Sequence, residues 1–111
     1  MDKIYYITLL LDFYGELLTC KQRSVMSSYY FDDYSLNEIA EEHSITRQAV
    51  QDMIKRTEKL LKQYEQKLML VDKYLKRKEK VENIVKELDR LIGEGNEELL
   101  HVKSLVDRIL D

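Results

Sequence analysis

Apolar residues recur along this chain at the three- and four-residue spacing of amphipathic helices. The first helix is predicted over residues 3–14, ended by Gly15, on the apolar series Ile4, Ile7, Leu10, Leu11 and Tyr14. A second helix over residues 20–30 is expected to bury Val25, Met26, Tyr29 and Tyr30. No run of alternating polar and apolar residues predicts a strand, so the pattern indicates an all-α protein.

Three helix starts carry residues suited to capping. Thr19 with Gln22, and Ser35 with Glu38, have the capping-box spacing, in which each side chain satisfies a backbone amide of the other residue. Thr46 provides a third cap, directly before a new apolar stripe. These caps predict helices over residues 20–30, from 36 to near 43, and from 47 onward.

The second half of the chain reads as continuous helix. No proline or glycine occurs between Thr46 and Ile92, yet a single helix of about 45 residues at 1.5 Å per residue would be far longer than a small core. We therefore expect a break near residues 68–72, with the following helix packing back. Gly93 and Gly95 predict a stop, and Asn96 is expected to cap a last helix over residues 97–110.

The segment from Ser35 to Arg56 has the spacing of a helix-turn-helix. Its inward positions are expected to hold two helices at a steep angle, with Ala40 small enough for a close crossing; these positions are Ile39, Ile45, Val50 and Met53. Ser44 stands in the turn where glycine is usual, because the backbone there is left-handed. The prediction is a helix-turn-helix domain over residues 1–66 and a helical extension over residues 67–111.

Charge limits the kind of partner this domain can bind. The chain has 18 basic and 21 acidic residues and a net charge of −3, so it lacks the overall basic footprint of many nucleic-acid-binding proteins. A local excess exists, since residues 47–62 hold five basic and two acidic side chains. The preceding segment is acidic and would repel phosphates: Asp32, Asp33, Glu38, Glu41 and Glu42.

Candidate contacts with nucleic acid lie on the second helix of the motif. If its N-terminal end enters a major groove, Arg47, Gln48 and Gln51 are placed to read base edges. Lys55, Arg56 and Lys59, further along, are placed to meet phosphates.

Other function classes find little support in the sequence. No nucleophile, base and orienting group can be assembled from the serines and two histidines, so we expect no enzyme, no metal site and no cofactor. The lone Cys20 suits a reducing cytoplasm. The apolar run over residues 4–11 is too short for the roughly 20 residues of a membrane span and lacks a cleavage site, which predicts no membrane insertion.

Two family resemblances rest on particular stretches. Residues 19–23, 29–30, 35–42 and 44–50 resemble region 4 of bacterial sigma factors, which implies a sigma-region-4-like helix-turn-helix bundle and DNA binding. Residues 10–19, 54–56 and 59–61 extend a similarity, over about residues 1–92, to the YlxM family of small bacterial proteins. That resemblance implies a link to protein targeting, because YlxM-like proteins are generally encoded beside the signal recognition particle GTPase.

Two functional hypotheses follow. The first is a regulatory protein that contacts DNA or the signal recognition particle RNA through the helix from Thr46. The second is an accessory protein that docks on the targeting GTPase and touches no nucleic acid. The helical extension is relevant to both hypotheses. Its apolar spacing suits either an internal hairpin with residues 97–110 or a two-stranded coiled coil, on the positions Val81, Ile84, Leu88 and Leu91. We expect a homodimer.

Overall fold

A computed structural model describes residues 2–110, and every regular element within that range is helical. The chain divides into two units, residues 1–71 and 72–111. The all-α helix-turn-helix bundle expected from the sequence is confirmed.

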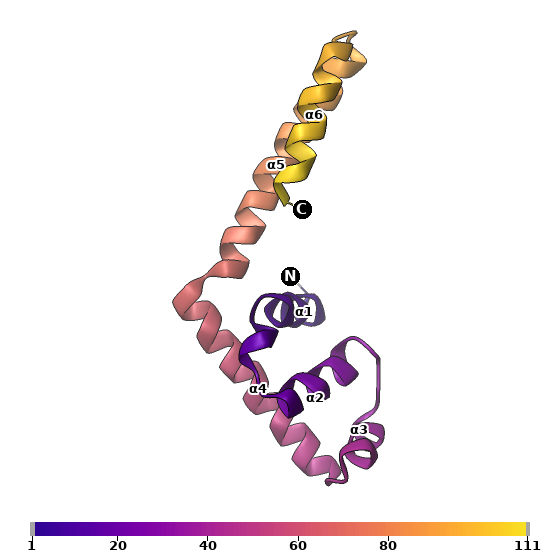
Figure 1. The fold of residues 1–111 in the computed structure, drawn as a ribbon, viewed down its shortest axis with the longest axis vertical. Coiled ribbons are helices and arrows are strands. Elements are labelled where there is room, and N and C mark those ends of the chain that lie inside the picture. The colour runs from indigo at the N-terminus through magenta and orange to yellow at the C-terminus, as the bar shows by residue number, and fades with distance from the viewer. Residues whose placement is uncertain (1, 111) are drawn as a thin grey trace. The chain divides into compact units, whose positions relative to one another are not determined.

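In the first unit, three shorter helices lie along one side of a long one (Figure 1). These are α1 (Lys3–Tyr14), α2 (Cys20–Tyr30) and α3 (Leu36–His43), packed against α4 (Arg47–Leu68), with a short 3-10 turn (Gly15–Leu17) after α1. Their shared core contains fully buried side chains from every helix: Ile7, Leu10, Val25, Met26, Ile39, Val50 and Leu61. The long helix α4 is therefore the element on which the other three are assembled.

The predicted caps are present. The Thr19 hydroxyl accepts from the Gln22 amide at 3.2 Å while the Gln22 side chain accepts from the Thr19 amide at 3.0 Å. Ser35 and Glu38 form the same reciprocal pair, at 3.1 and 3.0 Å. Both boxes confirm helix starts that were predicted from spacing alone.

Two apolar side chains expected in the core are exposed instead. Ile4 is 58% exposed and Tyr29 is 37% exposed, although both occupy the predicted apolar faces of their helices. They line one open groove between the first turn of α1 and the last turn of α2, together with Tyr30 and Tyr34. Helical periodicity predicted the correct faces but could not show that, within residues 2–71, this end of the bundle is left uncovered.

The expected break in the long helical segment occurs at Met69. This residue adopts the left-handed conformation (φ 55°) between α4 and α5 (Leu70–Gly93). The Tyr14 hydroxyl donates to Glu65 Oε1 at 2.6 Å and accepts from the Leu70 amide at 3.0 Å, while the same Glu65 oxygen accepts from the Val71 amide at 3.0 Å. Tyr14 and Glu65 thus satisfy the first amides of α5, which a helix start otherwise leaves without partners.

The second unit contains an antiparallel helical hairpin. After α5, a 3-10 turn (Glu97–Leu99) leads into α6 (Leu100–Asp107) and a final 3-10 turn (Arg108–Leu110). The two helices lie side by side (Figure 1), and Lys103 of α6 pairs with Asp89 of α5 at 2.6 Å. Of the two arrangements that the sequence allowed, the chain itself forms the hairpin.

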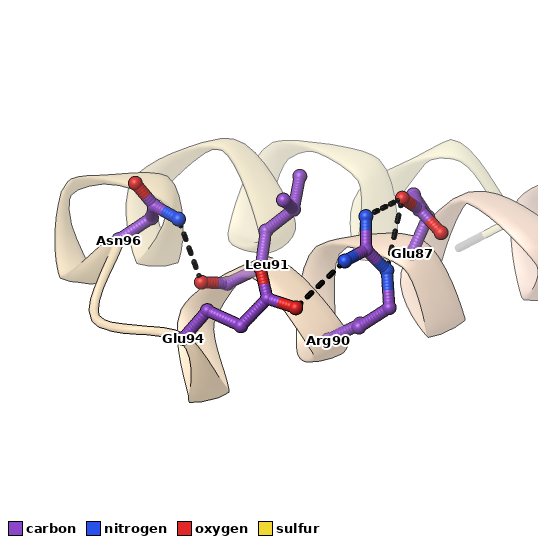
Figure 2. Close-up of polar contacts among 5 residues, drawn as sticks. All are labelled: Glu87, Arg90, Leu91, Glu94 and Asn96. Carbon is purple, nitrogen blue, oxygen red and sulfur yellow. Dashed lines mark hydrogen bonds and ion pairs between the residues drawn. The ribbon is translucent and has the colours of Figure 1, made fainter.

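The prediction that the Asn96 side chain caps the last helix is wrong. The side-chain amide of Asn96 donates from Nδ2 back to the Leu91 carbonyl at 3.0 Å. It makes no cap bond to the turn that follows. Figure 2 shows this bond beside Arg90, which donates to Glu87 and, at 2.8 Å, to Glu94. Asn96 therefore closes the end of α5, and α6 begins after a 3-10 turn instead of at a capped residue.

Candidate nucleic-acid interface

The turn between α3 and α4 has a defined hydrogen-bond pattern. Ser44 is left-handed (φ 55°, ψ 42°), as the spacing predicted. Its amide donates to the Glu41 carbonyl at 3.2 Å, and the Ile45 amide donates to the Ala40 carbonyl at 3.0 Å. This pair of bonds is the Schellman pattern that ends many helices, and it fixes where α4 departs from α3.

The packing of the motif follows the predicted inward positions. Ile39 and Val50 are fully buried, and Ala40 is 8% exposed where the two helices meet. Ile45 and Met53 are half-buried. The two helices are therefore held as a helix-turn-helix whose second helix, α4, turns its other side to solvent.

The beginning of α4 presents two of the predicted base-reading side chains. Thr46 caps the helix by accepting from the Ala49 amide at 3.0 Å. Arg47 and Gln48 are exposed in the first turn. Gln48 donates from Nε2 to Asp52 Oδ1 at 2.9 Å, which holds its amide group along the helix surface. A glutamine amide has a second N–H and an acceptor oxygen, so this bond does not use up its capacity to pair with a base.

Three exposed lysines follow on the outward side of α4. Lys55, Lys59 and Lys62, which we call the lysine stripe, lie at four- and three-residue spacing. At about 100° per residue they share a narrow face with Gln48, on the side away from the buried Val50, Ile54 and Leu61. The stripe also lines one shallow groove with Glu58, Gln63 and Gln66.

Two acidic residues border the lysine stripe: Asp52, which is exposed and accepts from Gln48, and Glu58, which lines the same groove as the lysines. Glu58 accepts a hydrogen bond from the Tyr30 hydroxyl and pairs with Lys3 at 3.6 Å. Its side chain is only 12% exposed. Burial and the bond to Glu58 raise the pKa of Tyr30 above its usual range. Glu58 is thus engaged with α1 and α2, and its charge is offset there by Lys3.

The remaining predicted contacts lie beside the outward face. Gln51 is half-buried and lines a groove with Tyr29, Tyr30 and Leu36, which Lys55 also borders. Arg56 is exposed on the other side and donates from Nε to the Asp52 carbonyl at 3.4 Å. The structure therefore groups Gln48, Lys55 and Lys59 on one face, whereas Arg47, one residue before Gln48, points about 100° away from it around the helix. Lys62 was missing from the predicted set, although its seven-residue distance from Lys55 places it on the same face.

Helix α3 carries the opposing charge. Glu38 lies within its capping box, where hydrogen bonds from the backbone and hydroxyl of Ser35 lower the pKa of its carboxyl group. Glu41 and Glu42 are exposed. A phosphate backbone that approached α3 closely would meet these two carboxylates, so a favourable approach must run along the lysine stripe.

Residues 2–110 offer no support for two other kinds of site. Within this range, no group of three or more histidine, cysteine, aspartate or glutamate side chains is placed to hold a metal ion. None of the helices described is long and apolar enough to cross a membrane.

The fold and this surface together define a small, all-α helix-turn-helix protein. Residues 1–99 match the model of the family UPF0122, described as "Putative helix-turn-helix protein, YlxM / p13 like", and the chain belongs to this family. It is 48% identical over 109 residues to the UPF0122 protein YlxM of Bacillus subtilis strain 168, covering 98% of this chain and 94% of that protein. It is 46% identical over 112 residues to UPF0122 proteins of Bacillus cereus strain AH187 and Bacillus anthracis strain A0248, covering 98% of each chain. The resemblance to the YlxM family inferred from the sequence is confirmed.

Proposed function

We propose that this protein is a cytoplasmic helix-turn-helix regulator that binds nucleic acid, DNA or RNA, through the outward face of α4. The observation that supports this most strongly is the lysine stripe, whose neighbour Glu58 is mostly buried and already paired with Tyr30 and Lys3. Three lysines on one helix face, with Asp52 as the exposed carboxylate beside them, would supply the phosphate contacts that provide most nucleic-acid affinity. The acidic total charge of the chain restricts binding to this face.

The proposed contacts divide into two kinds. Arg47 and Gln48, exposed in the first turn of α4, would meet base edges in a major groove, as the first residues of a recognition helix do in the sigma-region-4-like arrangement. Gln48 presents the donor and acceptor that pair with adenine. Lys55, Lys59 and Lys62 would contact phosphates and set the register of the helix along the duplex.

The pathway in which the protein acts is part of the proposal. The resemblance to YlxM-like proteins links it to the signal recognition particle, so the particle RNA is a candidate ligand beside duplex DNA. A deep, narrow groove of A-form RNA would exclude α4, so binding to that RNA would use the lysine stripe on its phosphates more than Arg47 and Gln48 on its bases.

A second function is favoured by a different observation. Glu41 and Glu42 are exposed beside the reading helix, and the second unit exposes several large apolar side chains. Such surfaces suit a protein partner better than a phosphate backbone. The alternative is an accessory factor that docks on the targeting GTPase and binds no nucleic acid.

A matched pair of double variants tests the nucleic-acid proposal. Lys55→Gln with Lys59→Gln removes two charges from the lysine stripe, and Lys86→Gln with Arg108→Gln removes two exposed charges from the second unit. Fluorescence anisotropy with labelled duplex DNA and with the particle RNA, over a salt series, should show weaker binding for the first variant alone. Its slope of log affinity against log salt should fall by about one for each lysine removed.

Three outcomes decide between the functions. Equal losses in both double variants would mean that net charge, and not the α4 face, drives binding. Absence of binding to either nucleic acid at about 50 mM salt would overturn the proposal. In that case, binding of the full chain to the purified GTPase, unchanged by Lys55→Gln with Lys59→Gln, would support the accessory function.

A further inference from the structure

The hairpin of the second unit has a small core of its own. Within residues 72–110, Val81 and Leu88 are the apolar side chains that fall below a tenth of full exposure. Units of about 40 residues usually need disulfides, metals or association with another chain to be stable. The lone cysteine of this protein is Cys20, in the first unit, so a disulfide within the hairpin is excluded.

One flank of the hairpin is apolar and exposed. Ile84 on α5 is 46% exposed, and three residues of the returning segment are between 39% and 51% exposed: Val102 and Leu105 on α6, and Ile109 in the final 3-10 turn. Ile84 lies three residues after Val81 and four before Leu88. At about 100° per residue, it therefore borders the helix face that these two packed residues occupy. In an antiparallel pair, the residues of the returning segment fall on the same side of the seam, opposite the Asp89–Lys103 ion pair. We call these four residues the apolar flank.

The charges of the hairpin are separated along its length. Residues 72–80 hold five basic and two acidic side chains, whereas residues 82–98 hold six acidic and two basic ones. Four basic residues share one side of α5, where they line a common groove: Lys73, Lys76, Arg77 and Lys80. Glu94 and Glu98 are exposed near the far end of the hairpin. The hairpin therefore has a basic end and an acidic end, with the apolar flank between them.

The spacing of these charges makes the apolar flank of one copy complementary to the apolar flank of a second copy. Lys103 opposite Asp89 sets the register of α6 against α5, and it places Leu105 and Val102 at the level of residues 87–90. The apolar flank is thus centred near Glu87. Lys80 and Glu94 lie seven residues to either side of Glu87, which is about 10 Å in each direction along a helix.

We propose that the apolar flank is a homodimer interface in which two hairpins pack antiparallel about a two-fold axis. Under that symmetry, Lys80 of one copy meets Glu94 of the second copy and Glu94 meets Lys80, as an isologous contact requires. The four apolar side chains of each copy are covered by those of the other, which gives a four-helix arrangement. This inference is independent of the nucleic-acid proposal, because it uses residues of the second unit alone.

Cysteine crosslinking tests the predicted register in the full chain. In a Cys20→Ser background, Lys80→Cys with Glu94→Cys should form a covalent dimer under mild oxidation, detected on a non-reducing gel. The two cysteines of one chain cannot pair with each other, since fourteen residues of helix separate them by about 21 Å and a disulfide requires Cα atoms within about 7 Å. Lys80→Cys alone should stay monomeric on the gel. A crosslink in that single variant would indicate parallel packing and overturn the arrangement.

Sedimentation equilibrium tests the interface without crosslinks. The unmodified chain should show twice its mass of 13.3 kDa at tens of micromolar. Leu105→Glu places a charge on the apolar flank and should raise the dimer Kd at least about tenfold. The matched control Ser104→Glu adds the same charge to the neighbouring exposed position of α6, which faces away from the flank, and should leave the Kd unchanged. A monomeric unmodified chain would overturn the proposal. Equal effects of Leu105→Glu and Ser104→Glu on the Kd would also overturn it.

Discussion

At the residue scale, three left-handed positions without glycine stand out. Asp33, Ser44 and Met69 have φ values of 60°, 55° and 55°, and each follows the end of a helix. A side chain in this conformation costs roughly 1–2 kcal/mol because its Cβ crowds the backbone. Ser44 bears most directly on function, since it sets the turn from which α4 begins.

We predict that Ser44→Gly stabilises the protein. The gain should be about 0.5–1 kcal/mol, because relief of the left-handed strain exceeds the extra entropy that glycine brings to the unfolded chain. Urea denaturation measures the free energy of unfolding. Ser24→Gly, inside α2 and right-handed, is the control and should destabilise by a similar amount. A loss of stability in Ser44→Gly would show that the Ser44 side chain itself supports the turn.

The raised pKa values of two tyrosines predict how the stability of the protein responds to alkaline pH. Burial, then the hydrogen bond to Glu65, raises the pKa of Tyr14, and burial with the bond to Glu58 raises that of Tyr30. A raised pKa in the folded state gives stability that is complete below the unfolded value of about 10 and is lost as the pH rises toward the folded value. The free energy of unfolding should therefore fall above about pH 10.

The tyrosine contribution can be isolated by substitution. Tyr14→Phe with Tyr30→Phe should be less stable at pH 7 but should lose less stability between about pH 9 and 11 than the unmodified chain. Tyr5→Phe with Tyr34→Phe, at exposed positions, should follow the unmodified chain. Parallel alkaline curves for all three proteins would contradict the assignment.

At the element scale, the break between α4 and α5 depends on one carboxylate. Glu65, in the last turn of α4, accepts from both the Tyr14 hydroxyl and the Val71 amide. Hydrogen bonds to a charged group contribute about 1.5–3 kcal/mol, and losing the carboxylate leaves the first amides of α5 without their partner. The end of α4 and the beginning of α5 are thus coupled to α1.

We predict that Glu65→Ala destabilises the first unit by on the order of 2 kcal/mol. Glu65→Gln should have an intermediate effect, because its amide oxygen can still accept one of the two bonds. Chemical denaturation followed by circular dichroism gives the free energies. Gln66→Ala, at the exposed neighbouring position of α4, is the control and should change stability little. Equal effects of Glu65→Ala and Gln66→Ala would show that the network is not stabilising.

At the scale of the whole molecule, the two proposed surfaces lie in different units. The lysine stripe lies in the first unit and the apolar flank in the second. If the flank pairs two copies, one particle carries two copies of α4 and two lysine stripes. Binding of both stripes to one nucleic acid would add their phosphate contacts, which raises both the affinity and its dependence on salt.

This separation predicts that two variants both weaken binding but differ in oligomeric state. Leu105→Glu should become monomeric and bind duplex DNA with lower apparent affinity and a shallower salt slope. Lys55→Gln with Lys59→Gln should remain dimeric while its binding weakens. Sedimentation and anisotropy on the same samples measure both properties. A Leu105→Glu monomer that binds with unchanged affinity and slope would show that each copy binds nucleic acid alone.

The sequence by itself determined the helices and the motif. Caps at Thr19, Ser35 and Thr46 act within three residues, and the left-handed turn at Ser44 is set by the spacing of its flanking helices. Such interactions connect residues that are close along the chain, so their pattern can be read directly from the order of amino acids. The break near Met69 was also predicted from the sequence, because an unbroken helix would be too long for a small core.

The tertiary structure alone decided which side chains the site can use. The bond from Tyr30 to Glu58 spans 28 residues and that from Tyr14 to Glu65 spans 51, and no local pattern predicts either pairing. Periodicity likewise gave no sign that Gln51 borders a groove or that Ile4 and Tyr29 lie at an unfilled end of the bundle. A helix face is a local property, whereas its cover and its charge partners depend on helices distant in the chain. The lysine stripe is therefore visible in the sequence, but the burial and pairing of Glu58 beside it are properties of the fold.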